Sequence, residues 1–377
     1  MNLLSRGLLT LSTLVVFIAP VFGKDLVVAQ VAPFSGPQAV TGKAIHAGAR
    51  LYFDQVNAEG GIGGARLRFE TRDDAQQPAE TVRLTREVVQ QLAPVALIGT
   101  VGTSNLQAVI NDGVLVRAGL PLVGAVSGAS GVVGGRNVFV VKASYHDEVN
   151  RLFASLAALQ VTRLGLVIQD DGLGADVSAG AEAAAGRNGV VISARAAYAR
   201  NTTEVAPAVQ AMLQARPQAI FLGATTAAAI EFVRQYRAQG GDATLYGMSI
   251  IDSKQLLDQL GPELARGYAF SVVLPLESQT TLELVREYLR LRRKSTDPDL
   301  SARSIEGFVA AKVLVTALRA VASESRAEPT PAMVLRALQS MRRADMGGYV
   351  LDFSQPGRSA STHVDFAMFG SGGKVVH

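Results

Sequence analysis

Small hydroxyl-bearing residues follow several apolar runs in the first half of the chain. Ser35 follows the first run, Thr103 and Ser104 follow a later one, and Ser127 and Gly128 follow the next. Where such runs form parallel strands, ligands bind beyond the carboxyl ends of the strands, at helix N-termini that offer unpaired N–H donors. These residues therefore predict a cradle for a carboxylate or another electron-rich group. The alternative is that the hydroxyls only cap helices.

Residue patterns that carry catalysis are weak in this sequence. It has no cysteine, no Gly-x-Ser-x-Gly motif, and four histidines that stand apart from other metal ligands. The run Gly172-Leu173-Gly174 resembles part of a dinucleotide-binding fingerprint, but Val177 takes the place of the third glycine. Asp170 and Asp171 would also repel a pyrophosphate. We therefore predict that the protein is not an enzyme and holds no cofactor and no metal ion.

The first residues are typical of a secretory signal peptide. Arg6 precedes an apolar stretch at 8–20, and the residues at 21–23 are small enough for cleavage. The alternative is a membrane anchor, but the stretch is shorter than the roughly 20 residues that span a bilayer. We expect cleavage after a signal at 1–23, a mature chain that begins near Lys24, and a soluble periplasmic product without disulfides or a lipid-modified cysteine.

The charge balance argues against nucleic acid as a partner. The chain has 377 residues, with 36 Lys and Arg against 32 Asp and Glu and a formal net charge of +4. The densest basic run, Arg292-Arg293-Lys294, ends a predicted helix, where positive charges complement the helix C-terminus. The sequence contains no tryptophan and no aromatic residues interleaved with a basic run. We therefore expect no nucleic-acid partner.

The elements that position these residues alternate between strand and helix. Short β-branched runs interleaved with helical patterns are typical of βαβ units and parallel sheets. The first unit predicts helices near 45–56, from 78 onward and at 105–118, and strands at 26–31, 67–71, 95–98, 120–123 and 137–141. The second unit predicts helices at 147–159, 175–187, 204–214 and 227–239, and strands at 164–168, 190–194, 219–222, 245–248 and 267–274. Three helices follow at 281–294, 302–322 and 331–341, then strands at 349–353 and 363–369.

Several motifs together resemble the leucine/isoleucine/valine-type periplasmic binding proteins, and the resemblance spans the mature chain. The opening run at 31–37, Val-Ala-Pro-Phe-Ser-Gly-Pro, is the first of these motifs. The others are at 48–57, 60–64, 73–74, 98–107, 121–130, 142–147, 169–174, 306–308 and 347–348.

The resemblance implies an α/β fold of the type I periplasmic binding class. In that class two Rossmann-like lobes with parallel-sheet cores are joined by a three-segment hinge and close around a ligand. We expect crossovers near 142–145, 272–276 and 347–351. One lobe would contain 24–142 and 275–348, and the other 143–274 and 349–377.

The resemblance assigns the first-lobe cradle to ligand binding but departs from the family in the second lobe. Ser249 stands where family members carry the acid that holds an α-amino group. Thr41, Leu173 and Thr225 stand where tyrosines commonly lie. A buried ammonium needs a counter-charge or several acceptors. The remaining candidates for that counter-charge are Asp147, Asp171 and Asp252.

Two interpretations of Tyr145, which lies near the first expected crossover, have equal weight. Its side chain could offer the ligand an aromatic face or a hydroxyl, or it could only pack at the hinge. The predicted ligand contacts are thus Ser35, Thr41, Thr103, Ser104, Ser127, Gly128, Tyr145, Leu173, Thr225 and Ser249.

The expected function is that of a monomeric periplasmic solute-binding protein of an ABC importer. It would capture a small amino acid or amino-acid-like compound by hinge closure and dock on a membrane permease. Two alternatives stay open. The protein could be a ligand-sensing subunit of a signalling system, or a receptor for a carboxylate or amide that is not an amino acid.

Overall fold

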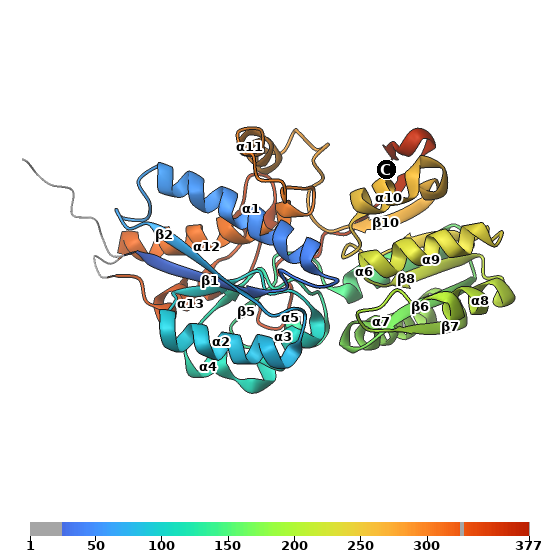
Figure 1. The fold of residues 1–377 in the computed structure, drawn as a ribbon, viewed down its shortest axis with the longest axis horizontal. Helices are drawn as coiled ribbons and strands as arrows, with labels where there is room; N and C mark the ends of the chain where they lie inside the picture. Colours follow the sequence, from blue (N-terminus) through green and yellow to red (C-terminus); the bar gives the residue numbers. More distant parts are fainter. Residues whose placement is uncertain (1–24, 325–327, 377) are drawn as a thin grey trace, which may run out of the picture.

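The structure, a computed structural model, describes residues 25–324 and 328–376. Figure 1 shows two α/β lobes side by side, one built mainly from the first part of the chain and the other from its middle. The predicted signal peptide at 1–23 lies outside the described residues. Within the described ranges, no helix combines the length and the apolar character needed to cross a membrane.

The first lobe is built on a five-stranded parallel sheet of order β2-β1-β3-β4-β5. Every residue of β3 and all but one of β1 are buried and most are apolar, as expected of a parallel sheet covered on both faces. The strands are β1 (Leu26–Ala32), β2 (Leu67–Asp73), β3 (Ala96–Ile98), β4 (Leu122–Val123) and β5 (Val138–Phe139). The helices between and after them are α1 (Ala39–Ala58), α2 (Pro78–Leu92), α3 (Thr103–Asp112), α4 (Val114–Arg117) and α5 (Ser130–Val133).

The second lobe is built on a seven-stranded sheet of order β14-β13-β10-β9-β8-β6-β7. Its strands are parallel except β13 and β14, which pair antiparallel at one edge. The strands are β6 (Arg163–Asp170), β7 (Val191–Ala199), β8 (Ala219–Gly223), β9 (Thr244–Gly247), β10 (Tyr268–Val272), β13 (Asp365–Phe369) and β14 (Val375–Val376). The helices are α6 (Tyr145–Ala158), α7 (Gly172–Asn188), α8 (Ala206–Ala215), α9 (Thr226–Ala238), α10 (Ser253–Ala265) and the short 3-10 turn η1 (Ser371–Gly373).

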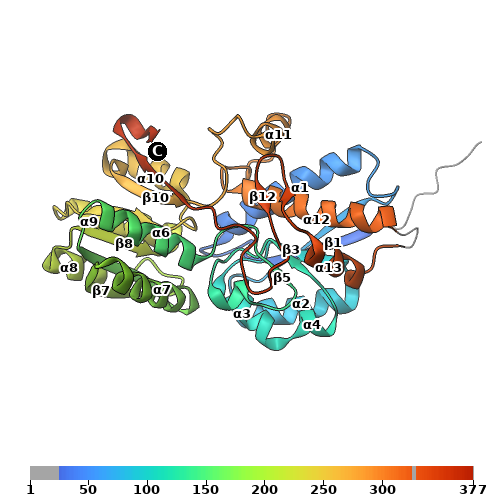
Figure 2. The ribbon, with the colours of Figure 1, turned by 180° about the vertical axis from the view of Figure 1, so that it is seen from behind.

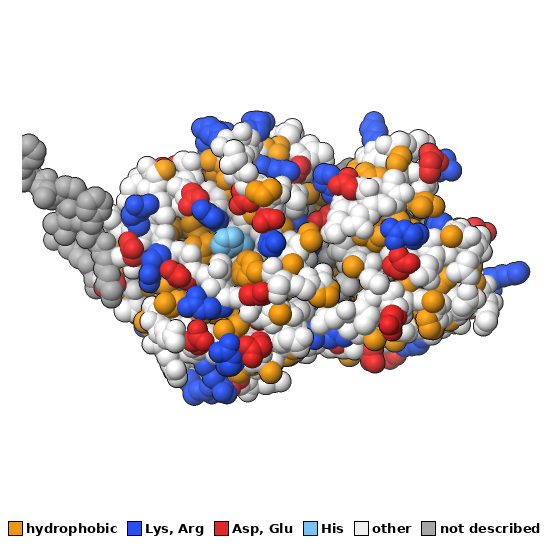
Figure 3. Space-filling model, in the orientation of Figure 1, with side chains coloured by type: hydrophobic (Ala, Val, Ile, Leu, Met, Phe, Trp, Pro, Cys, Tyr) orange, Lys and Arg blue, Asp and Glu red, His pale blue; other side chains and the backbone are white. Residues whose placement is uncertain are grey.

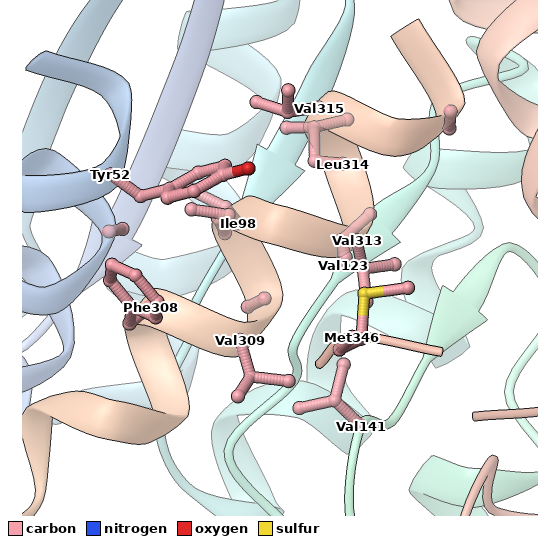
Figure 4. Close-up of a cluster of buried hydrophobic side chains, with 14 of the residues drawn as sticks. Tyr52, Ile98, Val123, Val141, Phe308, Val309, Val313, Leu314, Val315 and Met346 are labelled. Atoms are coloured by element: carbon pink, nitrogen blue, oxygen red, sulfur yellow. The ribbon is translucent and has the colours of Figure 1, made fainter. Parts of the chain in front are cut away.

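Three late helices return to the first lobe: α11 (Glu283–Arg292), α12 (Ser304–Glu324) and α13 (Pro331–Ser340). In Figure 4, α12 carries Phe308 and Val309 into a cluster with Tyr52 of α1 and Ile98 of β3, and the Tyr52 and Phe308 ring centroids are 5.0 Å apart. Glycines let α1 and α12 approach closely, since a Cβ on Gly48 would lie 1.8 Å from the Ser304 carbonyl oxygen.

The third connection between the lobes lies later in the chain than predicted. Tyr349, Leu351, Phe353 and Ala360 pack in the core of the first lobe, and β12 (Val350–Leu351) pairs with β11 (Ala344–Asp345). The chain joins the second sheet only at β13 (Figure 2). The expected crossover at 347–351 is therefore wrong, because the apolar residues from 349 to 360 are buried in the first lobe.

The Tyr349 hydroxyl nevertheless lies at the hinge. It is 2.9 Å from the Val141 carbonyl oxygen and 3.1 Å from the Val273 carbonyl oxygen, so it contacts the two other segments that connect the lobes. One side chain thus links the polypeptide segments whose backbone must rotate if the lobes move apart.

The predicted alternation of strands and helices is confirmed, with local differences. The helix predicted at 105–118 is two helices, because Gly113 adopts a left-handed backbone with φ of 77° between α3 and α4. The helix α10 was not predicted; Gly261 and Pro262 interrupt its pattern. The strand predicted at 349–353 shrinks to the two residues of β12.

Candidate functional site

A pocket lies between the lobes, beyond the carboxyl ends of β3, β4, β6 and β8. We call it the cleft pocket; it holds about 460 Å³ of empty space, which includes the open solvent at its mouth. Polar side chains from both lobes line it, among them Gln76, Gln169, Asp171 and Arg303. The predicted contacts Thr41, Thr103, Tyr145, Leu173 and Thr225 also line it.

The predicted first-lobe cradle is assembled around two hydroxyls. Thr103 Oγ1 and Ser127 Oγ are 2.9 Å apart, and both side chains are buried. Thr103 is the first residue of α3, and no side chain caps the N-terminus of this helix. The helix start therefore brings N–H donors and a partial positive charge to the cleft pocket. Neither Thr103 nor Ser127 serves as the cap of α3.

Gly128 positions Tyr145 rather than lining the cleft pocket itself. Tyr145 N donates to the Gly128 carbonyl oxygen at 2.8 Å, and a Cβ on Gly128 would lie 2.8 Å from both the backbone nitrogen and a ring carbon of Tyr145. The Tyr145 side chain is buried and lines the pocket. Burial raises the pKa of its hydroxyl to about 12, and the hydroxyl bonds to Ser127. Tyr145 thus packs at the hinge and also faces the pocket.

Asp171 lies on the side of the second lobe that faces the cleft, and its carboxylate accepts hydrogen bonds from four donors. Its carboxylate accepts hydrogen bonds from Leu173 N at 2.9 Å, Gln169 Nε2 at 3.0 Å, Ser104 Oγ at 3.2 Å and Arg200 Nε at 3.2 Å. Leu173 N is the backbone of the first turn of α7, so Asp171 is the N-cap of that helix. Ser104 comes from the first lobe, and its bond to Asp171 crosses the cleft.

Arg200 is a functional candidate that the sequence reasoning missed. It follows β7, and its Nη2 donates across the cleft to the Gln76 carbonyl oxygen at 2.9 Å and to Asn105 Oδ1 at 2.8 Å. The described structure is therefore a closed form in which the lobes are bonded directly. The rule that ligand contacts follow strand ends, applied to the end of β7, would have singled this residue out.

The other five predicted contacts do not line the cleft pocket: Ser104, Ser127 and Gly128 lie next to residues that do, and Ser35 and Ser249 have other surroundings. Ser35 is exposed, and its backbone nitrogen is tied to Asp73 Oδ1 at 3.3 Å. Ser249 lines a second pocket beside the hinge, which we call the hinge pocket, together with Ser271 and Glu306. Arg303 lines both pockets and donates from Nη1 to the Ser249 carbonyl oxygen at 2.6 Å.

Buried charges surround the hinge pocket. Lys142 Nζ lies 2.8 Å from Glu306 Oε1, and both side chains are almost fully buried. Burial works against ionisation of Glu306, but Lys142 and Arg303 hold the pKa of this carboxyl below its usual value. In the second lobe, Glu148 accepts hydrogen bonds from Ser249 N at 2.9 Å and Ser249 Oγ at 2.8 Å, and also from Ser271 Oγ. Burial raises the pKa of Glu148.

The glycine run at 172–174 serves packing. A Cβ on Gly174 would lie 1.9 Å from the Gln169 carbonyl oxygen, and one on Gly172 would lie 2.5 Å from Gln107 Oε1. Within 25–324 and 328–376, no three His, Cys, Asp or Glu side chains gather into a group that could hold a metal ion. On the face seen in Figure 3, basic and acidic side chains are interspersed.

Known proteins are similar to this chain over almost its whole length. Residues 26–374 match the profile of a family described as periplasmic binding protein. A substrate-binding periplasmic protein from Ralstonia solanacearum is 42% identical, covers 93% of this chain and 99% of its own, and superposes with a TM-score of 0.89. A possible leucine/isoleucine/valine-binding protein from Rhodopirellula baltica is 25% identical, with coverage of 96% and 98% and a TM-score of 0.87.

Two further proteins are similar either in fold alone or over a short stretch of sequence. A branched chain amino acid ABC transporter protein from Thermus thermophilus with bound valine has a TM-score of 0.84 over 94% of this chain and 95% of its own, but at 17% identity it shows a common fold only. The Leu/Ile/Val-binding protein BraC3 of Rhizobium johnstonii is 35% identical over 71 residues, 19% of each chain. The chain thus matches about a fifth of that relative's length.

Proposed function

Because the chain belongs to the periplasmic binding protein family, of the leucine/isoleucine/valine type that its sequence resembles, we propose that it captures a small polar solute by closing its lobes and presents it to the permease of an ABC importer. The observation that carries the proposal is the cleft pocket, which both lobes line and which is crossed by direct bonds from Ser104 and Arg200.

Closure follows from this geometry. In the open form the bonds of Arg200 to Gln76 and Asn105 would be exchanged for water, and the cradle of Thr103 and Ser127 would be hydrated. A solute held by that cradle and then covered by Tyr145, Leu173 and Thr225 gains hydrogen bonds in a drier environment. It favours the closed form only by its additional affinity for that form. The closed form then presents a surface formed by both lobes to a permease.

A solute screen tests the proposal. The purified mature chain is mixed with single amino acids, short amides, and aliphatic or aromatic carboxylates, and the melting temperature and the radius of gyration are measured. We expect one class to raise the melting temperature and to make the particle more compact. A chain that responds to none of these solutes by either measurement would contradict capture by closure.

Paired variants then locate the site. Replacing both cradle hydroxyls, Thr103→Ala with Ser127→Ala, should remove the response to the solute found in the screen. The matched control is Thr316→Ala with Ser323→Ala, which removes a threonine and a serine from the exposed face of α12. Equal affinity in the two double variants would place the solute elsewhere.

A further inference from the structure

A largely buried positive charge contacts the residue at which the resemblance expects a negative one. Arg303 precedes α12, its side chain is 11% exposed, and it lines the cleft pocket. Its Nη1 donates at 2.6 Å to the backbone oxygen of Ser249, the residue at the position of the amine-binding acid. At this end of the cleft pocket, the charged side chain is therefore a guanidinium from the first lobe, and Ser249 lies behind it in the hinge pocket.

The neighbours of Arg303 do not fully neutralise its charge, because it shares one carboxylate with Lys142. Arg303 Nη2 lies 3.4 Å from Glu306 Oε2, while the other oxygen of Glu306 lies 2.8 Å from Lys142 Nζ. One carboxylate therefore faces two cations. Arg303 Nε is buried and has no hydrogen-bond partner. The nearby Glu148 is occupied by hydrogen bonds from Ser249 and Ser271 on its own lobe.

The acid that does line the cleft pocket, Asp171, already has partners for both of its oxygens. Its Oδ2 accepts from Gln169, Ser104 and Arg200, and its Oδ1 accepts from Leu173 N. Arg200 also balances its charge directly. Asp252, another candidate counter-charge, caps α10 by accepting from Gln255 N at 2.9 Å and lines the hinge pocket instead.

The remaining side of the cleft pocket offers donors and neutral groups. No side chain caps α3, and Gln76, which is 6% exposed, lies against Gly102 at the start of this helix. Gln76 Oε1 is buried and has no partner. Because the two ends of an amide are assigned by their surroundings, Gln76 can donate to or accept from a bound solute. It cannot neutralise a charge.

We infer that the cleft pocket takes a small carboxylate that lacks an ammonium group. The carboxylate would lie at the start of α3, beside Thr103 and its partner Ser127, and the amine-free part of the solute would face Arg303. An amino acid would bring a second, positive charge into a closed cleft whose only acid is already paired, and an unpaired buried charge is strongly unfavourable. This inference rests on the proposed function, because it names the solute that closure captures.

Solutes that differ only by the amine test the inference. The pairs are valine with isovalerate, phenylalanine with hydrocinnamate, and glutamate with glutarate, and isobutylamine serves as the amine without a carboxylate. Calorimetric titration should show the acid of at least one pair binding about 100-fold more tightly than its amino acid. An amino acid that binds as tightly as its paired acid overturns the inference and leaves solute capture intact. A panel in which no acid binds also overturns it, and the amides of the wider screen then decide the proposed function.

Variants of Arg303 give an independent readout. In a folded protein, Arg303→Gln should weaken binding of the acid by roughly 10- to 100-fold, the effect of losing a charged donor, whereas Arg303→Lys should recover part of the affinity. Arg319→Gln is the matched control, because Arg319 lies on α12 and its side chain is 50% exposed. Circular dichroism checks the fold of each variant. Unchanged affinity in folded Arg303→Gln overturns the inference.

Discussion

Arg200→Met should weaken the closed form of the protein without touching the cradle. Methionine keeps much of the length of the side chain and removes its donors. The wild-type guanidinium makes two hydrogen bonds to the opposite lobe, at 2.9 Å to the Gln76 carbonyl oxygen and at 2.8 Å to Asn105 Oδ1. Both acceptors belong to buried residues, so closure without Arg200 leaves them without this partner.

The size of the effect follows from the number of bonds and their exposure. A hydrogen bond to a charged group contributes about 1.5–3 kcal/mol net. The Arg200 side chain is 20% exposed, so water competes in part, and we take about 2 kcal/mol for the two bonds together. That free energy is about a 30-fold change in the ratio of closed to open molecules. If the free protein is mostly open, the dissociation constant rises by the same factor.

Small-angle scattering and calorimetric titration measure the two consequences. At a solute concentration that closes the wild type, the Arg200→Met protein should be less compact than the wild type, and its affinity for the captured solute should fall by about 30-fold. The matched control is Arg195→Met in the middle of β7, because Arg195 contacts Glu182 and Ser178 of its own lobe. If Arg200→Met binds and scatters like Arg195→Met, Arg200 does not hold the lobes together and the reasoning fails.

Two further predictions concern stability and are tested by urea unfolding. Lys142→Met should destabilise the fold by about 1.5–3 kcal/mol, because it removes the nearer of the two cations beside the buried Glu306 carboxylate and leaves Arg303 alone. Since the pKa of Glu306 is lowered from 4.5, the wild-type advantage is fully present above pH 4.5 and is lost as the pH falls through the lowered pKa. An equal loss in Lys142→Met with Glu306→Leu would contradict this. Gly48→Ala should cost about 1–3 kcal/mol or more, because its Cβ would meet the Ser304 carbonyl oxygen at 1.8 Å, whereas Gly186→Ala, which meets nothing within 4 Å on α7, should be neutral or slightly stabilising.

The fold was predictable from the sequence because its signals are local. Buried parallel strands such as β1 and β8 read as short apolar runs, and α1 and α2 show an apolar stripe of helical period. The wrong predictions concern segments whose structure is determined by a tertiary contact. The segment from Tyr349 to Ala360 predicts a short strand at 349–353, but its place in the first lobe depends on the core cluster that it shares with α11 and α12. No hydrophobic periodicity in the sequence indicates that contact.

The site was predictable only where a residue follows a strand. That rule predicts Thr103 and Ser127 as ligand contacts, and their hydroxyl oxygens lie 2.9 Å apart; ligand contact by them stays a prediction. Arg303 was missed because it precedes a helix in the last third of the chain and reaches the cleft through the return of α12 to the first lobe. The sequence indicated Asp171 as a candidate counter-charge, but its hydrogen-bond partners were not predictable. Two of the four partners, Ser104 and Arg200, are distant in sequence.

Arg200 connects the affinity of the cleft with its selectivity. The same guanidinium that bonds to Gln76 and Asn105 across the cleft also pairs with Asp171 on its own lobe. Closing the lobes therefore holds the Arg200 guanidinium in the position from which it pairs with Asp171. A solute with an ammonium group would have to compete with Arg200 for that carboxylate, and success in that competition would break the bonds that hold the lobes closed. Discrimination against ammonium and stabilisation of the closed form thus depend on one side chain.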